Sequence, residues 1–277
     1  MLFGSYGVFA RLIGPSLGLF TYSWARYLIA AIFVGGYLFI RSQKIKLSGR
    51  DARWLIGWVV ADTASVILIF SSFNKIDLGV AYFLLYAGII LGGYFLGYIL
   101  YGERFTRLKV FSALLSLAGL FFMFFSSWKQ ANIIYLAAAF GAGLAGSFWY
   151  TGSNKLRNIP QMQLVFLDAI CVSLLSFVGA LFYREPLPFR APLGVWVILL
   201  VFALVYIFGV KFTVYGFQKL ESHLGNLIMP LEAVFGAIFG FIFFREYLGL
   251  AAWLGGLLIF AAALLPNLFV KQKSPSN

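Results

Sequence analysis

Long runs of apolar residues, separated by short polar breaks, extend along nearly the whole 277-residue chain. Most runs hold about 20 residues, the length that a helix needs to cross a hydrocarbon core of roughly 30 Å. The first run is short for a complete span, and no cleavable signal peptide is expected. The pattern predicts an all-α membrane protein with ten transmembrane helices, over residues 1–13, 17–40, 54–73, 78–101, 107–126, 131–153, 161–183, 194–217, 223–244 and 250–270.

A second pattern repeats along the chain. A constant shift of 143 residues pairs Gly93, Gly97, Ile99 and Glu103 with Gly236, Gly240, Ile242 and Glu246. We therefore predict a duplicated five-helix unit, with residues 1–128 as the first repeat and residues 129–277 as the second. Because five is odd, the second copy must enter the membrane upside down, which gives two inverted repeats.

The repeated glycines and glutamates have separate expected roles. The pairs Gly93/Gly97 and Gly236/Gly240 place small residues on one helix face, so we expect close helix packing there, compatible with sliding of the same helices during conformational exchange. Glu103 and Glu246 come just before the next predicted helices. The positive end of a helix favours a nearby carboxylate, so both are expected to act as interfacial caps.

Composition supports membrane insertion and explains the positive charge. The chain is 62% hydrophobic and 11% charged with a net charge of +12, and its mean hydropathy is +0.93. With the N-terminus in the cytoplasm, thirteen lysines and arginines fall in inside loops and six outside. This bias predicts a multi-pass protein of the cell (inner) membrane with both termini cytoplasmic, and it requires no nucleic-acid partner.

Five ionisable residues fall well inside the predicted spans: Arg26, Asp62, Asp168, Lys211 and Glu232. Each costs about 2.5–3.5 kcal/mol at the centre of a span, so each should face the bundle interior. We assign Asp62, Glu232 and Lys211 to a substrate site in which either acid could also carry a proton. For Arg26 we expect a structural charge, paired for example with Asp62 on the neighbouring helix.

Aromatic residues on two of the predicted helices add to this site. Tyr82 and Tyr86 fall on the fourth span and Trp149 on the sixth. Aromatic faces beside a carboxylate suit an organic cation or an aromatic amino acid, so these three residues join the substrate-binding set. Packing against lipid or neighbouring helices is their alternative role.

The residues needed for metal or covalent chemistry are scarce. The chain has one cysteine, Cys171, and one histidine, His223, and it lacks H-E-x-x-H and G-x-S-x-G motifs. We therefore expect no metal site, no cofactor and no enzymatic activity.

Several stretches together resemble the EamA-type permeases of the drug/metabolite transporter superfamily. They are WARYLIAA (24–31), YGERFT (101–106), SLAGLFFM (116–123), MPLEAVFGAIFGFIFFREYLG (229–249) and GGLLIFAAAL (255–264). The resemblance implies alternating access around a cavity lined mainly by helices 1, 3, 4, 6, 8 and 9, which places Asp168 of helix 7 away from that cavity. It also implies a helix break at Pro230, which the fourth helix, with Tyr86 and Ala87 at the equivalent place, lacks.

The resemblance leads to one main functional expectation. We expect an exporter or exchanger of small organic metabolites such as amino acids or amines, working by alternating access, with protons as a possible coupling ion and a monomer or homodimer as the assembly. A lipid-linked-sugar flippase of the same architecture, a non-transporting scaffold and a membrane enzyme are the alternatives. A closed aromatic vestibule favours the solute carrier, whereas a lateral opening to lipid favours the flippase.

Overall fold

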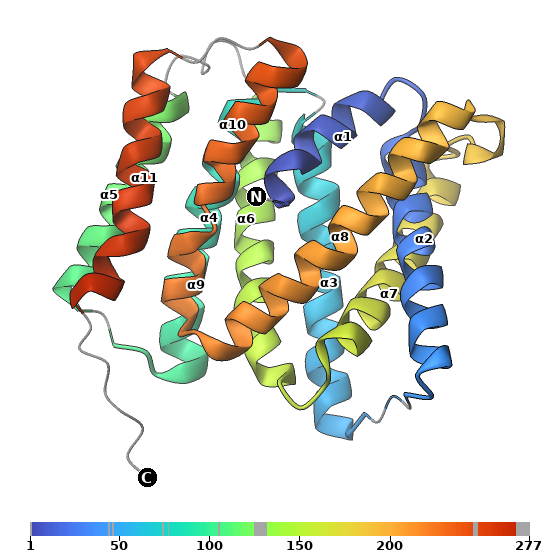
Figure 1. The fold of residues 1–277 in the computed structure, drawn as a ribbon, viewed down its shortest axis with the longest axis horizontal. Coiled ribbons are helices and arrows are strands. Elements are labelled where there is room, and N and C mark those ends of the chain that lie inside the picture. The colour runs from blue at the N-terminus through green and yellow to red at the C-terminus, as the bar shows by residue number, and fades with distance from the viewer. Residues whose placement is uncertain are drawn as a thin grey trace.

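The computed structural model describes residues 2–43, 45, 47–73, 75–76, 78–104, 106–124, 132–245 and 249–269, with the backbone alone at 79, 124, 222, 223 and 266–269. Within these residues the regular structure is entirely helical (Figure 1). The α-helices are α1 (Tyr6–Ile13), α2 (Leu19–Ile40), α3 (Gly49–Phe73), α4 (Leu78–Tyr101), α5 (Arg107–Phe124), α6 (Ile133–Gly152), α7 (Gln161–Phe182), α8 (Leu193–Lys219), α9 (Ser222–Ile228), α10 (Leu231–Phe244) and α11 (Leu250–Phe269). Short 3-10 turns, η1 (Phe3–Ser5), η3 (Ser153–Leu156) and η4 (Pro188–Arg190), join some of them.

The membrane-spanning character of the helices follows from their length and composition. Seven helical segments of the described chain are long and apolar enough to cross a bilayer: Leu19–Ile40, Gly49–Phe73, Val80–Tyr101, Ile133–Leu156, Gln161–Phe182, Leu193–Lys219 and Leu224–Phe244. The chain is therefore a multi-pass membrane protein. The prediction of ten spans is not confirmed by this criterion, because α1 is short and neither α5 nor α11 qualifies.

A helix break separates α9 from α10. Helix α9 ends at Ile228, Met229 and Pro230 form a turn, and α10 begins at Leu231. Proline has no N–H to donate, and its ring collides with the carbonyl four residues earlier in a continuing helix. In contrast, α4 runs without interruption from Leu78 to Tyr101, so the break lies in the second half of the chain alone.

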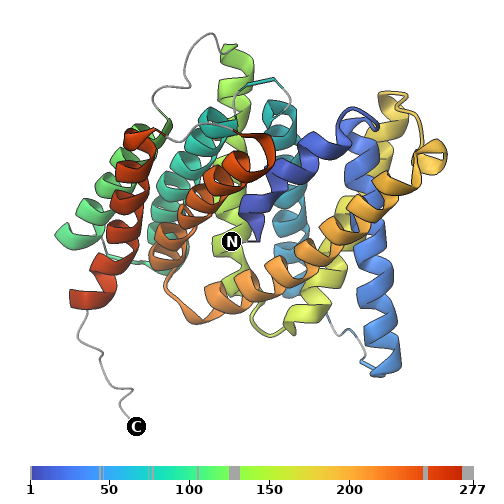
Figure 2. The same cartoon turned by 45° about the horizontal axis from the view of Figure 1, so that its top comes forward.

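Helices that are far apart in the sequence pack side by side. Helix α2 packs against α7, α5 against α11, and α6 against both α3 and α4. Figures 1 and 2 place the α5–α11 pair at one end of the molecule and the α2–α7 pair at the other. In Figure 1, α2 runs downward from α1, whereas α7 runs upward from the end of α6.

The backbone has matching helix ends in the two halves. Positive φ among the described residues occurs at Ser42 and Arg184, which are 142 residues apart, and at Gly102 and Arg245, which are 143 residues apart. The chain after Ser42 and after Arg184 closes in the same way: the next N–H donates to the carbonyl five residues earlier, at 3.0 Å for Gln43 and 2.9 Å for Glu185. The left-handed residue followed by this bond is the Schellman motif.

Helices α4 and α6 approach each other closely at a glycine pair. A Cβ added to Gly88 would lie 2.9 Å from the Cα of Gly143, and one added to Gly143 would lie 2.8 Å from the Cα of Gly88. Glycine therefore lets these two backbones meet without intervening side chains.

The glycines singled out by the repeat lie at other contacts. Gly93 faces the Asn226 side chain of α9, and a Cβ on Gly236 would lie 3.3 Å from the Tyr82 ring. Gly97 and Gly240 are buried. Sliding at these glycines stays a prediction.

The structure describes only one of the two glutamates that are expected as helix caps. The backbone N–H of Glu103 donates to the Gly97 carbonyl at 3.1 Å, just beyond the end of α4, and its side chain is half-buried. Glu246 lies outside the described residues. The capping role of both side chains stays a prediction.

Helix α2 is capped by a carboxylate from a distant loop. The Glu185 side chain accepts hydrogen bonds from the backbone N–H groups of Phe20 at 3.3 Å and Thr21 at 2.7 Å. Residue Gly18 at the N-cap has no side chain to satisfy these donors. Glu185 thus joins the α7–α8 connection to the start of α2 and places a negative charge at the positive helix end.

Replacing Glu185 with alanine is expected to destabilise the protein by about 1–2 kcal/mol, the usual cost of losing a helix cap. Thermal unfolding in detergent measures the effect, and Arg190→Ala, an exposed change in the same connection, serves as the control. Equal unfolding midpoints for the two variants would contradict this role of Glu185.

Candidate functional site

An aromatic chamber lies at the centre of the bundle. Its walls come from η1, α1, α2, α3, α4, α6 and α8, and its volume is about 80 Å³. The aromatic residues among its lining are Phe3, Tyr6, Tyr27, Phe70, Phe73, Tyr82, Tyr86, Trp149, Tyr150 and Tyr206. Pockets that bury small-molecule ligands usually measure about 300–1,000 Å³, so this conformation is closed to organic molecules of that size.

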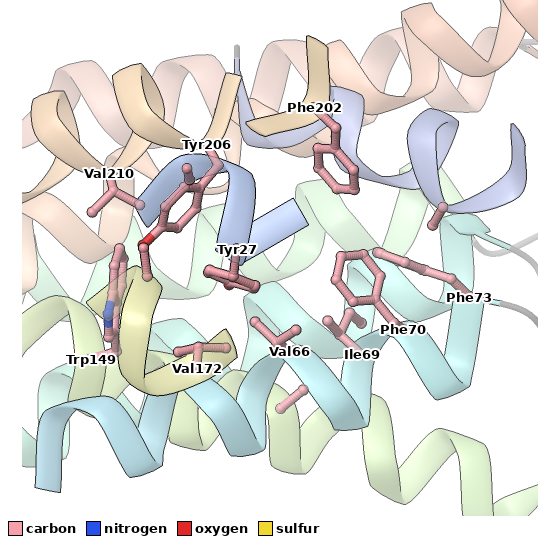
Figure 3. Packing of buried hydrophobic residues seen from close by; sticks show 14 of the residues in the cluster. Tyr27, Val66, Ile69, Phe70, Phe73, Trp149, Val172, Phe202, Tyr206 and Val210 are labelled. Atoms are coloured by element: carbon pink, nitrogen blue, oxygen red, sulfur yellow. The ribbon is translucent and has the colours of Figure 1, made fainter. Parts of the chain in front are cut away.

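Figure 3 shows how these side chains meet. Tyr206 and Val210 of α8 face Trp149 of α6, and Phe202 of α8 faces Phe70 of α3, with Tyr27 of α2 between the two groups. The Tyr27 and Tyr206 rings meet edge to face with their centroids 4.6 Å apart. Edge-to-face contacts of this kind stabilise the wall by about 0.5–1.5 kcal/mol each.

Asp62 is the carboxylate in the chamber wall. It lies in the middle of α3, is 9% exposed, and lines the cavity. The Tyr27 hydroxyl donates a hydrogen bond to Asp62 Oδ2 at 3.2 Å. This position is compatible with the assignment of Asp62 to a substrate site, which stays a prediction.

Asp168 lies directly behind this wall. It is fully buried and accepts hydrogen bonds from the Tyr206 hydroxyl at 2.7 Å and from Trp149 Nε1 at 3.4 Å. Its carboxyl also lies within hydrogen-bonding reach of Asp62. Two carboxyl groups can share a hydrogen bond only when one of them carries a proton.

No α7 residue belongs to the described lining, which agrees with the expectation that Asp168 lies away from the cavity. The structure adds that Asp168 accepts hydrogen bonds from two lining side chains, Trp149 and Tyr206. The available signal was its charge inside an apolar span, which is costly unless the group has polar partners. Those partners come from α6 and α8, and the sequence of α7 does not identify them.

Arg26 is buried in a cage of aromatic rings. It is 0% exposed, and its guanidinium carbon lies 4.1–5.8 Å from five ring centroids, those of Phe202, Tyr27, Tyr6, Phe70 and Tyr206. Among the described residues its three nitrogens have no hydrogen-bond partner. The expected Arg26–Asp62 ion pair is not formed, because the Tyr27 ring contacts Arg26 while its hydroxyl bonds Asp62.

Glu232 reaches the chamber through a tyrosine. It lies in the first turn of α10, and its Oε2 accepts from the Tyr86 hydroxyl at 3.4 Å. The Phe3 backbone N–H also donates to this carboxyl. The position beside the start of α10 favours a negative charge, although the Glu232 side chain is not part of the lining described above.

Tyr82 and Lys211 complete the set of residues assigned from the sequence. The Tyr82 hydroxyl accepts from the Gly7 N–H at 3.0 Å and donates to the Gly4 carbonyl at 3.4 Å, so it fastens the N-terminal segment to α4. Lys211 is not brought to the chamber: its Nζ lies 5.8 Å from the ring centroid of the adjacent Phe212. Proximity in sequence to the chamber residue Val210 does not suffice, since successive residues of a helix point in different directions.

In the part of the chain that the structure describes, no three His, Cys, Asp or Glu side chains gather in a way that could hold a metal ion. The lining of the chamber offers the Asp62 carboxyl, the Ser65 and tyrosine hydroxyls, and aromatic rings. Such groups can bind an organic molecule and hold a proton.

The EamA-like transporter family matches residues 1–125 and 132–268. The chain belongs to the EamA-like transporter family. This EamA-like protein thus contains two copies of the family's unit, and the family consists of membrane transporters of small molecules.

The fold has a close counterpart among solved structures. A crystal structure with 16% sequence identity superimposes with a TM-score of 0.81, over 98% of this EamA-like chain and 95% of the other. At this identity the similarity establishes the fold alone. No curated protein matches the sequence.

Proposed function

We propose that this protein exchanges or exports a small organic metabolite, such as an amine or an amino acid, by alternating access through the aromatic chamber. The observation that supports this most directly is a central cavity with Asp62 in its wall and ten aromatic side chains around it. Aromatic faces bind flat or cationic groups, and a carboxylate supplies the counter-charge for an amine. Asp62, Tyr82, Tyr86 and Trp149 form the binding set, with Glu232 acting through Tyr86.

The movement follows from the architecture that we propose, ten spans in two inverted repeats, residues 1–128 and 129–277. The two family matches fall on either side of this boundary. The matched pairs of left-handed residues and the opposite directions of α2 and α7 (Figure 1) also support it. Rocking of one half against the other opens the chamber to each side in turn.

Orientation and coupling complete the proposal. The lysine and arginine distribution favours the inner membrane with both termini in the cytoplasm. Asp62 and Asp168 are neighbouring carboxyl groups that can share one proton, which supports protons as the coupling ion. The aromatic walls favour a solute carrier over a lipid-linked-sugar flippase.

A ligand screen followed by flux tests this function. Purified protein is unfolded thermally with amines, amino acids and nucleosides at two pH values, because a ligand that binds the folded state raises its stability. We expect one of the first two classes to raise the unfolding midpoint and to undergo counterflow in proteoliposomes. Lack of counterflow, or translocation of lipid-linked sugar in its place, would contradict the proposal.

A further inference from the structure

Arg26 is a buried cation that forms no hydrogen bond or salt bridge with the described residues, although Asp62 lies within its electrostatic reach. Its Nε, Nη1 and Nη2 atoms are covered, yet none has a hydrogen-bond partner among the described residues. An arginine carries five N–H donors and cannot lose its charge in a protein. A covered guanidinium without acceptors is unfavourable, and the energy of the cation–π contacts offsets only part of that cost.

Two tyrosine hydroxyls near the guanidinium are also buried without a hydrogen bond to the described residues. The Tyr6 and Tyr22 hydroxyls are buried and have no hydrogen-bond partner in the described chain. The guanidinium lies 5.1 Å from the Tyr6 ring centroid, and the Tyr22 hydroxyl lies within the electrostatic reach of Arg26. A tyrosine hydroxyl both donates and accepts, but neither hydroxyl bonds to the guanidinium, whose N–H donors therefore have no acceptor among the described residues.

The carboxylates of the chamber are already engaged. Asp62 bonds to Tyr27 and contacts Asp168, and Glu232 bonds to Tyr86. None of them forms a salt bridge with Arg26 in the described part of the chain. The missing acceptor must therefore come from outside the bundle or from a rearrangement of it.

The aromatic cage separates Arg26 from the chamber and also forms its wall. Four of the five caging rings, those of Tyr6, Tyr27, Phe70 and Tyr206, also line the cavity. Tyr6 belongs to the eight-residue helix α1, a much shorter element than the helices that hold the other three. A shift of α1 would carry the Tyr6 ring aside and join the guanidinium to the chamber.

We propose that Arg26, with the hydroxyls of Tyr6 and Tyr22, is the site that recognises the carboxylate of a substrate with a single carboxylate group. This inference rests on the proposed function, in which the chamber holds the substrate. A carboxylate accepts two parallel N–H bonds from one guanidinium, and its single charge matches the single charge of Arg26. The apolar part of the molecule then lies among the aromatic rings. The inference thereby narrows the proposed substrates, amines or amino acids, to those that carry a carboxylate.

Benzoate, benzamide and benzylamine test the charge requirement, because they share a ring and differ in one group. In thermal unfolding of the purified full chain, we expect benzoate to raise the midpoint and the neutral and cationic analogues to leave it unchanged. Arg26→Gln should weaken the apparent benzoate affinity by about 10-fold or more, since charge-assisted bonds are lost. Arg26→Lys should retain part of the benzoate affinity. The control Arg190→Gln, an exposed change in the α7–α8 connection, should retain all of it.

Milder variants cover the case in which Arg26→Gln does not fold. Tyr6→Phe and Tyr22→Phe remove one hydroxyl each, and either should lower the apparent benzoate affinity by about 5-fold. Equal midpoint shifts by benzoate and benzamide in the unaltered protein, or an unchanged benzoate shift in all these variants, overturn the anion site. Benzoate binding without counterflow of any compound would refute the transport function and leave the anion site intact. Counterflow of amines without benzoate binding would support the transport function and refute the anion site.

Discussion

Replacing Gly143 with alanine is expected to disrupt folding of the chain, whereas Gly141→Ala is expected to be tolerated. Both glycines lie on α6. A Cβ at Gly143 would lie 2.8 Å from the Cα of Gly88 and 3.0 Å from the Ile89 nitrogen, whereas one at Gly141 meets only the Leu68 side chain at 3.7 Å. Backbone atoms cannot rotate away as a side chain does, so helix α6 as a whole would have to move away from α4.

The expected cost at Gly143 is on the order of 3 kcal/mol, the upper end of the range for overpacked cores. At Gly141 the higher helix propensity of alanine should give a gain of up to about 1 kcal/mol. Size-exclusion chromatography in detergent measures the folded yield, and thermal unfolding measures the stability of what folds. Similar yields and midpoints for the two variants would show that the α4–α6 contact is looser than the structure has it.

The two glycine contacts also show where sequence reasoning ends. The repeat directed attention to Gly93, Gly97, Gly236 and Gly240, because spacing within one helix is visible in the sequence. The Gly88–Gly143 contact joins two different helices. No spacing within either helix indicates which of its faces will meet the other.

The helices themselves were predictable to within a few residues. Runs of apolar residues predicted 78–101 and 161–183, and the structure has Leu78–Tyr101 and Gln161–Phe182. This accuracy has a physical cause: in lipid every backbone polar group must be satisfied within the segment, so a long apolar run has to be helical. The break at Pro230 was visible for an equally local reason.

The site was predictable only in part. The cost of charge in a membrane pointed to Asp62 and Arg26, but the structure gives Arg26 an aromatic cage in place of the expected pairing with Asp62. The roles of Tyr27 and Tyr206 were missed, because a tyrosine in an apolar helix is equally compatible with lipid contact and with a buried hydrogen bond. Their roles depend on where α2 and α8 meet, which is a tertiary property.

Replacing Asp62 with asparagine is expected to reduce transport by at least about 10-fold, an effect of the size produced when one essential charge is removed from a site. Asparagine has nearly the same shape, and its side-chain oxygen can still accept from the Tyr27 hydroxyl, which bonds Asp62 at 3.2 Å. Its amide can donate to Asp168 as a protonated Asp62 would. The variant should therefore fold and remain fixed in a state resembling the protonated acid, unable to release a proton or to attract a cation.

Counterflow and gradient-driven uptake in proteoliposomes distinguish loss of proton release from loss of cation binding. The probe is the ligand identified by the thermal screen. If Asp62 carries the proton, Asp62→Asn should abolish accumulation driven by a pH gradient more completely than it slows exchange, because exchange requires no net proton movement. Glu232→Gln should have a weaker effect, since Glu232 reaches the chamber through Tyr86. Asp51→Asn is the matched control, because Asp51 lies at the start of the same helix and bonds Ser48 far from the chamber. Gradient-driven uptake at the unaltered rate in both Asp62→Asn and Glu232→Gln would place the coupling site elsewhere in the bundle.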